Sequence, residues 1–167
     1  SFRTIFNLLG PLLNPVRANK QLLGVFSDKY LKIIAETLDA HGSKKAWVVN
    51  GSDGMDEITL TGKTKIAQLS DNTIEEFEID PQKYGFKFCT QEALEGGTPS
   101  ENANKMINLF NGEHGAYRDI VLLNSAAALY IADKVNSFED GIELTKSIID
   151  SGKALDTLHN LKKISNE

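Results

Sequence analysis

Three acidic residues crowd into the segment Asp53-Gly54-Met55-Asp56-Glu57, which follows the apolar run Ala46-Trp47-Val48-Val49 and the residues Asn50-Gly51-Ser52. Such a run is typical of a strand that is buried on both faces of a parallel sheet. In open α/β sheets, ligands gather at the carboxyl ends of the strands. Carboxylates that crowd there repel one another unless a cation lies among them, and hard oxygen ligands beside a phosphate suit Mg²⁺. The pattern therefore indicates a magnesium site, and the alternative is an acidic surface turn.

Two further segments carry groups that could bind anions. Arg3 lies at the edge of an apolar stretch, where its guanidinium could bind a carboxylate through two hydrogen bonds. The alternative for Arg3 is a solvated side chain. The glycine-rich segment 96–100 precedes a predicted helix, and such loops can bind phosphate. Its spacing matches neither a P-loop nor a dinucleotide-binding motif, so we interpret it as an N-capped turn.

The other reactive side chains form no catalytic constellation in the sequence. None of His41, His114 and His159 has a second His or Cys at metal-ligand spacing. The single cysteine, Cys89, excludes an internal disulfide and fits a reducing compartment. Segment 86–89 is predicted to be a strand, which favours a buried structural thiol over a catalytic one. We therefore assign no catalytic nucleophile.

The elements that would position the acidic segment form a predicted βαβ unit. A strand is expected over 21–26, and Ser27 or Asp28 can cap a helix that ends at Gly42. The buried strand at 46–49 follows. Strand, helix and buried strand in this order indicate an α/β fold with a parallel-sheet core.

The rest of the chain divides into short β-type segments and then helices. An antiparallel excursion is expected in the middle, with strands at 57–61, 64–69 and 73–79. Helical periodicity dominates after residue 90, with helices expected at 100–112, 117–134, 138–151 and 153–164. These helices would flank the sheet of one compact unit.

The composition excludes several classes of protein. The chain has 167 residues, 41% of them hydrophobic, and a net charge of −5. Nucleic-acid binders usually have a basic balance, so we expect no nucleic-acid partner. No apolar run approaches the ~20 residues that span a bilayer, and the start does not resemble a signal peptide. We therefore expect a cytoplasmic protein with no membrane partner.

Taken together, the segments resemble the anthranilate phosphoribosyltransferases. The longest match is RTIFNLLGPLLNP at residues 3–15, which is similar to the segment that links the two domains of these enzymes. Further matches follow in the family's order: QLLGV at 21–25, GSDGMDE at 51–57, LEGG at 94–97, NA at 102–103, LNSAA at 123–127 and SGKA at 151–154. Asn50 stands where the family often has histidine. The resemblance implies an interdomain helical segment at 1–15 and a partial C-terminal α/β domain at 16–167.

The resemblance also implies a reaction. The amine of anthranilate would attack C1 of phosphoribosyl pyrophosphate and release pyrophosphate, a step of tryptophan biosynthesis. By position, Asp56 and Glu57 would coordinate Mg²⁺ and Arg3 would contact anthranilate, while the role of Asp53 is less certain. The family's glycine-rich donor loop lies upstream of the Arg3 segment, so we expect the chain alone to be inactive. The full-length family forms homodimers, largely through its N-terminal domain.

Two other functions compete with this hypothesis. A pyrimidine nucleoside phosphorylase shares the fold, although segment 3–15 fits the transferase better. A non-catalytic relative that binds nucleic acid is the second alternative, and the charge of −5 together with the retained Asp56 and Glu57 argues against it.

Overall fold

The structure is a computed structural model that describes residue 12 and residues 18–166. Arg3 and segment 1–15, apart from Leu12, lie outside the described residues. The predicted division into 1–15 and 16–167 therefore stays a prediction. In chain order, the described elements are β1 (Lys20–Gly24), η1 (Asp28–Tyr30), α2 (Leu31–Ala40), β2 (Lys45–Gly51), β3 (Thr64–Ser70), β4 (Thr73–Ile79), η2 (Pro81–Tyr84), η3 (Gln91–Ala93), α3 (Pro99–Phe110), α4 (Ala116–Ile131), α5 (Phe138–Asp150) and α6 (Lys153–Ser165).

A single four-stranded sheet in the order β1-β2-β3-β4 forms the centre of the described chain. β1 and β2 are parallel and joined by α2, which confirms the predicted βαβ unit. β3 and β4 extend the same sheet with antiparallel pairing. Only Asp71 and Asn72 separate them, and both have positive φ, as a two-residue hairpin turn requires. The mixed α/β fold class is thus confirmed.

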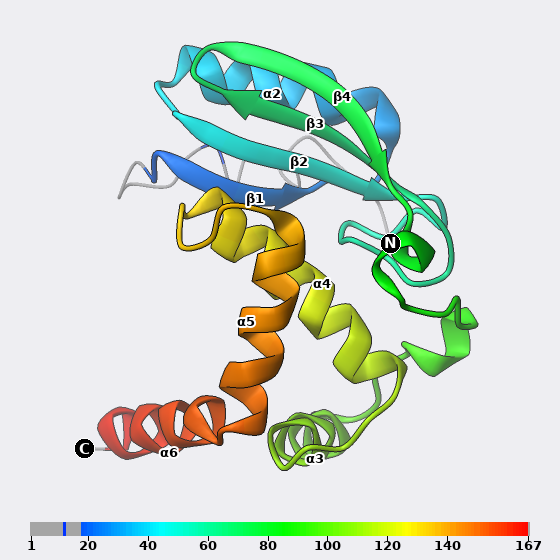
Figure 1. The fold of residues 1–167 in the computed structure, drawn as a ribbon, viewed down its shortest axis with the longest axis vertical. Helices are drawn as coiled ribbons and strands as arrows, with labels where there is room; N and C mark the ends of the chain where they lie inside the picture. The colour runs from blue at the N-terminus through cyan, green and yellow to red at the C-terminus, as the bar shows by residue number, and fades with distance from the viewer. Residues whose placement is uncertain (1–11, 13–17, 167) are drawn as a thin grey trace.

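Helix α2 covers one face of the sheet (Figure 1). Its buried side chains, Leu31, Ile34, Ala35 and Leu38, recur at helical spacing. They pack in one cluster with Ala46 and Val48 of β2. The predicted cap by Ser27 or Asp28 is not formed, because Tyr30 is the N-cap residue of α2 and Ser27 precedes η1 without a side-chain hydrogen bond.

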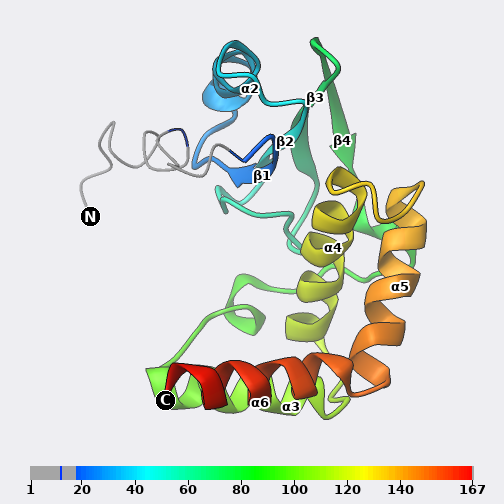
Figure 2. The ribbon, with the colours of Figure 1, turned by 90° about the vertical axis from the view of Figure 1, so that its left-hand side faces the viewer.

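Helices α4 and α5 lie on the opposite face (Figures 1 and 2). Trp47 and Val49 point into this second cluster, so alternate residues of β2 are buried on opposite faces, as the apolar run predicts. The core residues of α4 include Leu123, Ala126 and Ala127, each fully buried. α3 and α6 lie at the end of α4 and α5 that is remote from the sheet. None of the described helices is both long and apolar enough to cross a membrane.

Two predicted strands, at 57–61 and 86–89, are not formed. Both segments have irregular backbone in the structure. Ile58 and Leu60 are buried as predicted strand residues would be. However, the backbone of their segment forms hydrogen bonds with a side chain and a loop, and not with a neighbouring strand. The Ile58 N–H donates to the side chain of Asn124, and the Leu60 carbonyl accepts from the Cys89 N–H. Burial without periodic backbone pairing explains why the sequence pattern misleads here.

Candidate functional site

The loop after β2 lies beyond the carboxyl ends of the two parallel strands (Figure 1). Asp56 and Glu57 are on this loop and are both exposed. The last residue of β1, Gly24, packs against the backbone of Asp56. A Cβ on Gly24 would lie 1.6 Å from the carbonyl oxygen of Asp56, so only glycine allows this approach. The fold therefore places both carboxylates at the strand-end edge where α/β proteins bind ligands.

Asp53 has a different role, because its carboxylate is occupied within the loop. One oxygen accepts a hydrogen bond from the Met55 N–H at 3.0 Å. The other accepts from the hydroxyls of Thr59 and Thr61, at 2.8 and 2.7 Å. Partial burial raises the pKa of Asp53, but these hydrogen bonds outweigh it and leave the pKa below its ordinary value. Asp53 therefore shapes the loop through these hydrogen bonds, and Asp56 and Glu57 are the two carboxylates that the sequence assigns to a cation.

The electrostatics of the pair favour a cation. Partial desolvation and the neighbouring charge of Asp56 both raise the pKa of Glu57 above its ordinary value, although the residue is exposed overall. Within the described residues, no cluster of three or more His, Cys, Asp or Glu side chains forms a complete metal cage. Mg²⁺ at phosphate sites usually takes only one or two protein carboxylates and keeps waters and substrate oxygens. The pair fits Mg²⁺ shared with a phosphorylated ligand, while its role as a metal site stays a prediction.

A hollow of about 380 Å³ borders the same loop. Its lining includes Asn50, Ser52 and Gly54, together with Lys63 and Lys65 of the β3 side. The side chain of Asn50 is buried and donates a 2.7 Å hydrogen bond to the carbonyl of Val25. Asn50 thus ties the end of β2 to the end of β1, a structural use of the position where the family often has histidine.

One contributor to the loop was missed by the sequence reasoning. Asn124 of α4 accepts a hydrogen bond from the Ile58 N–H at 2.9 Å and donates one to the Ile58 carbonyl at 2.9 Å. It thereby holds the residue that follows Glu57. The signal was present, because Asn124 interrupts an apolar stretch of α4, and a half-buried amide on such a helix needs partners.

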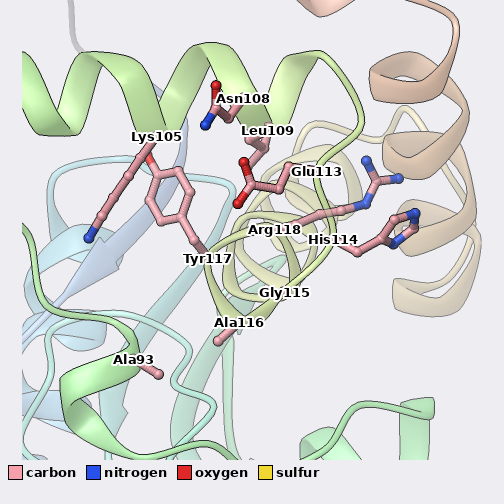
Figure 3. A pocket seen from close by; sticks show the side chains of 10 residues that line it. All are labelled: Ala93, Lys105, Asn108, Leu109, Glu113, His114, Gly115, Ala116, Tyr117 and Arg118. Carbon is pink, nitrogen blue, oxygen red and sulfur yellow. The ribbon is translucent and has the colours of Figure 1, made fainter.

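A second hollow, of about 240 Å³, lies between α3 and the start of α4. Figure 3 shows Lys105 and Asn108 of α3 and Tyr117 and Arg118 of α4 among the lining side chains, with Lys105 and Arg118 extending in different directions. Arg118 is 4% exposed and pairs with Asp150 at 2.5 Å. This hollow lies at the end of α4 that is remote from the sheet, away from the Asp56–Glu57 pair.

The glycine-rich segment 96–100 is an N-capped turn, as predicted. Thr98 and Glu101 form a reciprocal capping box at the start of α3. Asn102 bonds to both the N–H and the carbonyl of Gly97, at 2.8 and 3.1 Å. Side chains of the same segment therefore occupy the N–H groups of Gly97, Thr98 and Glu101, which a phosphate would otherwise contact.

Comparison with known proteins places this geometry in a family. The profile of the glycosyl transferase family, a/b domain, matches residues 1–155. The chain belongs to this family. Among its relatives, an anthranilate phosphoribosyltransferase of Petrotoga mobilis is 47% identical over 164 residues, which are 98% of this chain and 48% of that protein. The chain thus spans about half the length of the relatives that it matches.

Solved structures support the same family assignment. The anthranilate phosphoribosyltransferase of Thermus thermophilus matches with a TM-score of 0.87 and 37% identity, covering 96% of this chain and 47% of that one. The Saccharomyces cerevisiae enzyme in complex with PRPP and Mg matches with a TM-score of 0.83 and 28% identity, covering 95% and 46%. The family resemblance found in the sequence is therefore confirmed, because the chain matches the a/b domain of this glycosyl transferase family. Nothing in these comparisons favours a nucleoside phosphorylase or a nucleic-acid-binding relative.

Proposed function

We propose that this chain supplies the metal-binding half of an anthranilate phosphoribosyltransferase. The complete enzyme moves the 5-phosphoribosyl group from phosphoribosyl pyrophosphate to the amine of anthranilate and releases pyrophosphate. The observation that carries the proposal is the exposed Asp56–Glu57 pair at the carboxyl edge of β1 and β2. It occurs in a chain whose similar structures include one solved with PRPP and Mg.

In this proposal, Asp56 and Glu57 hold Mg²⁺ through one or both carboxylates. When bound, the ion supplies positive charge that stabilises the departing pyrophosphate. The chain then serves to position the two carboxylates. Gly24 fixes the backbone of Asp56, and Asp53 keeps the loop folded, so the two carboxylates need little reorganisation on binding.

Arg3 is proposed as the residue that binds the carboxylate of anthranilate. This assignment rests on the resemblance of segment 3–15, because Arg3 lies outside the described residues. A guanidinium that binds a carboxylate through two hydrogen bonds also orients the ring and its amine. Holding the weakly nucleophilic amine in line with C1 is catalysis by proximity, and it needs no covalent nucleophile. A homodimer and a cytoplasmic location complete the proposal.

The proposal is tested by loss of anthranilate fluorescence in the presence of phosphoribosyl pyrophosphate and Mg²⁺. We expect turnover by the complete gene product that carries this chain, and none by residues 1–167 alone. Glu57→Gln should lower kcat/KM at limiting Mg²⁺. Glu75→Gln, at an exposed position of β4, is the matched control and should not. Full activity of the Glu57→Gln variant at every Mg²⁺ concentration would refute the assignment of Asp56 and Glu57 as the Mg²⁺ ligands.

A further inference from the structure

We infer that Asn124 is a positioning residue for the Asp56–Glu57 pair, and that its side-chain amide sets the Mg²⁺ affinity of that pair. The inference rests on the proposed function of the pair. It concerns a residue that touches neither metal nor substrate and acts through the backbone of Ile58. The observation behind it is the placement of one amide against both polar groups of the residue that follows Glu57.

The contact reproduces the pairing of two backbone strands. Asn124 Oδ1 accepts from the Ile58 N–H at 2.9 Å, and Nδ2 donates to the Ile58 carbonyl at 2.9 Å. Nδ2 also donates to the carbonyl of Ile120 at 3.0 Å, one turn earlier in α4. The orientation of the amide is therefore set by its own helix before it meets the loop. Asn124 Oδ1 holds the peptide group that links Glu57 to Ile58. The plane of this peptide group determines the position from which the Glu57 side chain extends.

No neighbouring strand of the described sheet replaces this contact. Ile58 is fully buried, yet segment 57–61 is irregular. A buried N–H or carbonyl without a partner is costly, so the amide of Asn124 is what allows Ile58 to enter the core in this conformation. Ile58 anchors the loop in the cluster under α4, and the exposed pair lies immediately before that anchor.

Asn124 is held on a helix that is packed into the core. α4 is a 16-residue helix. On it, Leu123 and Ala127, which flank Asn124, are fully buried. Beyond its last turn, Asp133 pairs with Lys20 of β1 and, at 2.7 Å, with Lys45 of β2. The helix is therefore tied to the same two strands whose ends carry the loop. Gly24 fixes Asp56 from the β1 side, and Asn124 fixes Glu57 from the α4 side.

Partners that orient the direct ligands of a metal typically change its affinity by roughly 10–100-fold when removed. We expect Asn124→Ala to raise the half-saturating Mg²⁺ concentration of the complete gene product about tenfold or more. Activity should recover towards the wild-type kcat at high Mg²⁺. Asn124→Asp keeps the shape but puts a carboxylate against the carbonyls of Ile58 and Ile120, so we expect a similar shift.

Asn102→Ala is the matched control. It removes a pair of hydrogen bonds of the same geometry but at an exposed position, to Gly97 before α3, and should leave the Mg²⁺ dependence unchanged. A general loss of stability would lower the melting temperature in both variants, but it would not shift the Mg²⁺ dependence of one alone. An unchanged half-saturating concentration in both Asn124 variants, with an active wild type, would overturn the inference and leave the proposed function standing.

A readout without turnover uses the 167-residue chain. Hydrogen exchange followed by NMR should show faster exchange of the Ile58 N–H in Asn124→Ala, while the Val25 N–H, which donates to Val49, keeps its rate. An unchanged Ile58 rate would refute the contact. If the wild-type gene product shows no turnover, the proposed function fails. The inference is then decided by titration of the Asp56 and Glu57 amide signals with Mg²⁺ alone, where equal midpoints in wild type and Asn124→Ala would overturn it.

Discussion

Gly24 and Asp56 meet backbone to backbone at the carboxyl end of β1, so closely that a Cβ on Gly24 would lie 1.6 Å from the Asp56 carbonyl oxygen. The clash would be with backbone, which cannot rotate away as a long side chain can. The last residue of the first strand therefore determines how near the acidic loop can approach the sheet.

Gly24→Ala is expected to push the loop outward and to destabilise the protein by about 1–3 kcal/mol, the usual cost of overpacking. Because the displaced residue is Asp56, the Mg²⁺ requirement of the complete gene product should rise as well. Urea unfolding and Mg²⁺ titration of activity measure the two effects. Gly96→Ala is the control, since its Cβ would meet only the side chain of Asn102, at 3.3 Å. Equal behaviour of the two variants would contradict the proposed packing.

Asp53→Ala should loosen the loop without removing a proposed metal ligand. It deletes the acceptor of the Met55 N–H and of the hydroxyls of Thr59 and Thr61. We expect a loss of about 1–3 kcal/mol in unfolding free energy, because partly buried donors lose their acceptor. Chemical denaturation measures this loss. Glu75→Ala, on exposed β4, serves as the comparison and should change little.

The stability linked to Asp53 should depend on pH in the acid range. Its pKa is lowered in the folded state because the hydrogen bonds outweigh partial burial. A carboxyl with a lowered folded pKa stabilises the protein above its unfolded pKa, and this contribution disappears as the pH falls through the folded pKa. Unfolding free energy measured from pH 6 downward should therefore fall less steeply in Asp53→Ala than in the wild type. Parallel curves would argue against the linkage.

Asp133 offers a second acid titration, at the opposite end of the strands. Hydrogen bonds from Lys20 and Lys45 lower its pKa from 3.8 to about 2. Its stabilising contribution should be complete above pH 3.8 and should be lost as the pH falls towards 2. Carboxyl-detected NMR titration measures the pKa directly. Lys45→Ala should raise it towards the ordinary value, whereas Lys44→Ala, at the preceding position, should not.

Arg118 tests the helical end of the molecule. Its guanidinium is almost fully buried and pairs with Asp150, the last residue of α5. Asp150→Ala would leave a buried charge without its partner, and we expect a loss of about 2 kcal/mol in thermal or chemical unfolding. The exposed pair of Lys146 and Glu143 is the reference, and Glu143→Ala should cost less than about 0.5 kcal/mol. A similar small cost at Asp150 would show that Arg118 is not dependent on it.

Much of the fold followed from the sequence because local patterns report local physics. The apolar run at 46–49 predicted a strand with both faces buried, and β2 is such a strand. Helical spacing in 31–38 predicted the buried face of α2. The turn residues Asp71 and Asn72 predicted the hairpin in which they adopt positive φ. Each of these signals depends on neighbours within a few residues.

The acidic segment could be recognised in the sequence, but the different roles of its three acidic residues could not. Types and spacing placed Asp53, Asp56 and Glu57 together after a buried strand. Only the folded loop distinguishes Asp53, whose carboxylate accepts hydrogen bonds from Thr59 and Thr61, from Asp56 and Glu57. The irregular path of 57–61 was likewise hidden, because its burial looks like that of a strand.

The sequence by itself indicated the family and the βαβ unit, and it predicted which residues would hold a cation. The tertiary structure alone decided how those residues are held. Asn124 and Ile58 are 66 positions apart, and Gly24 and Asp56 belong to different elements. Periodicity shows which face of an element is buried, but it carries no information on which distant side chain supplies a buried peptide with its hydrogen bonds. That choice is made when helix α4 packs against the sheet.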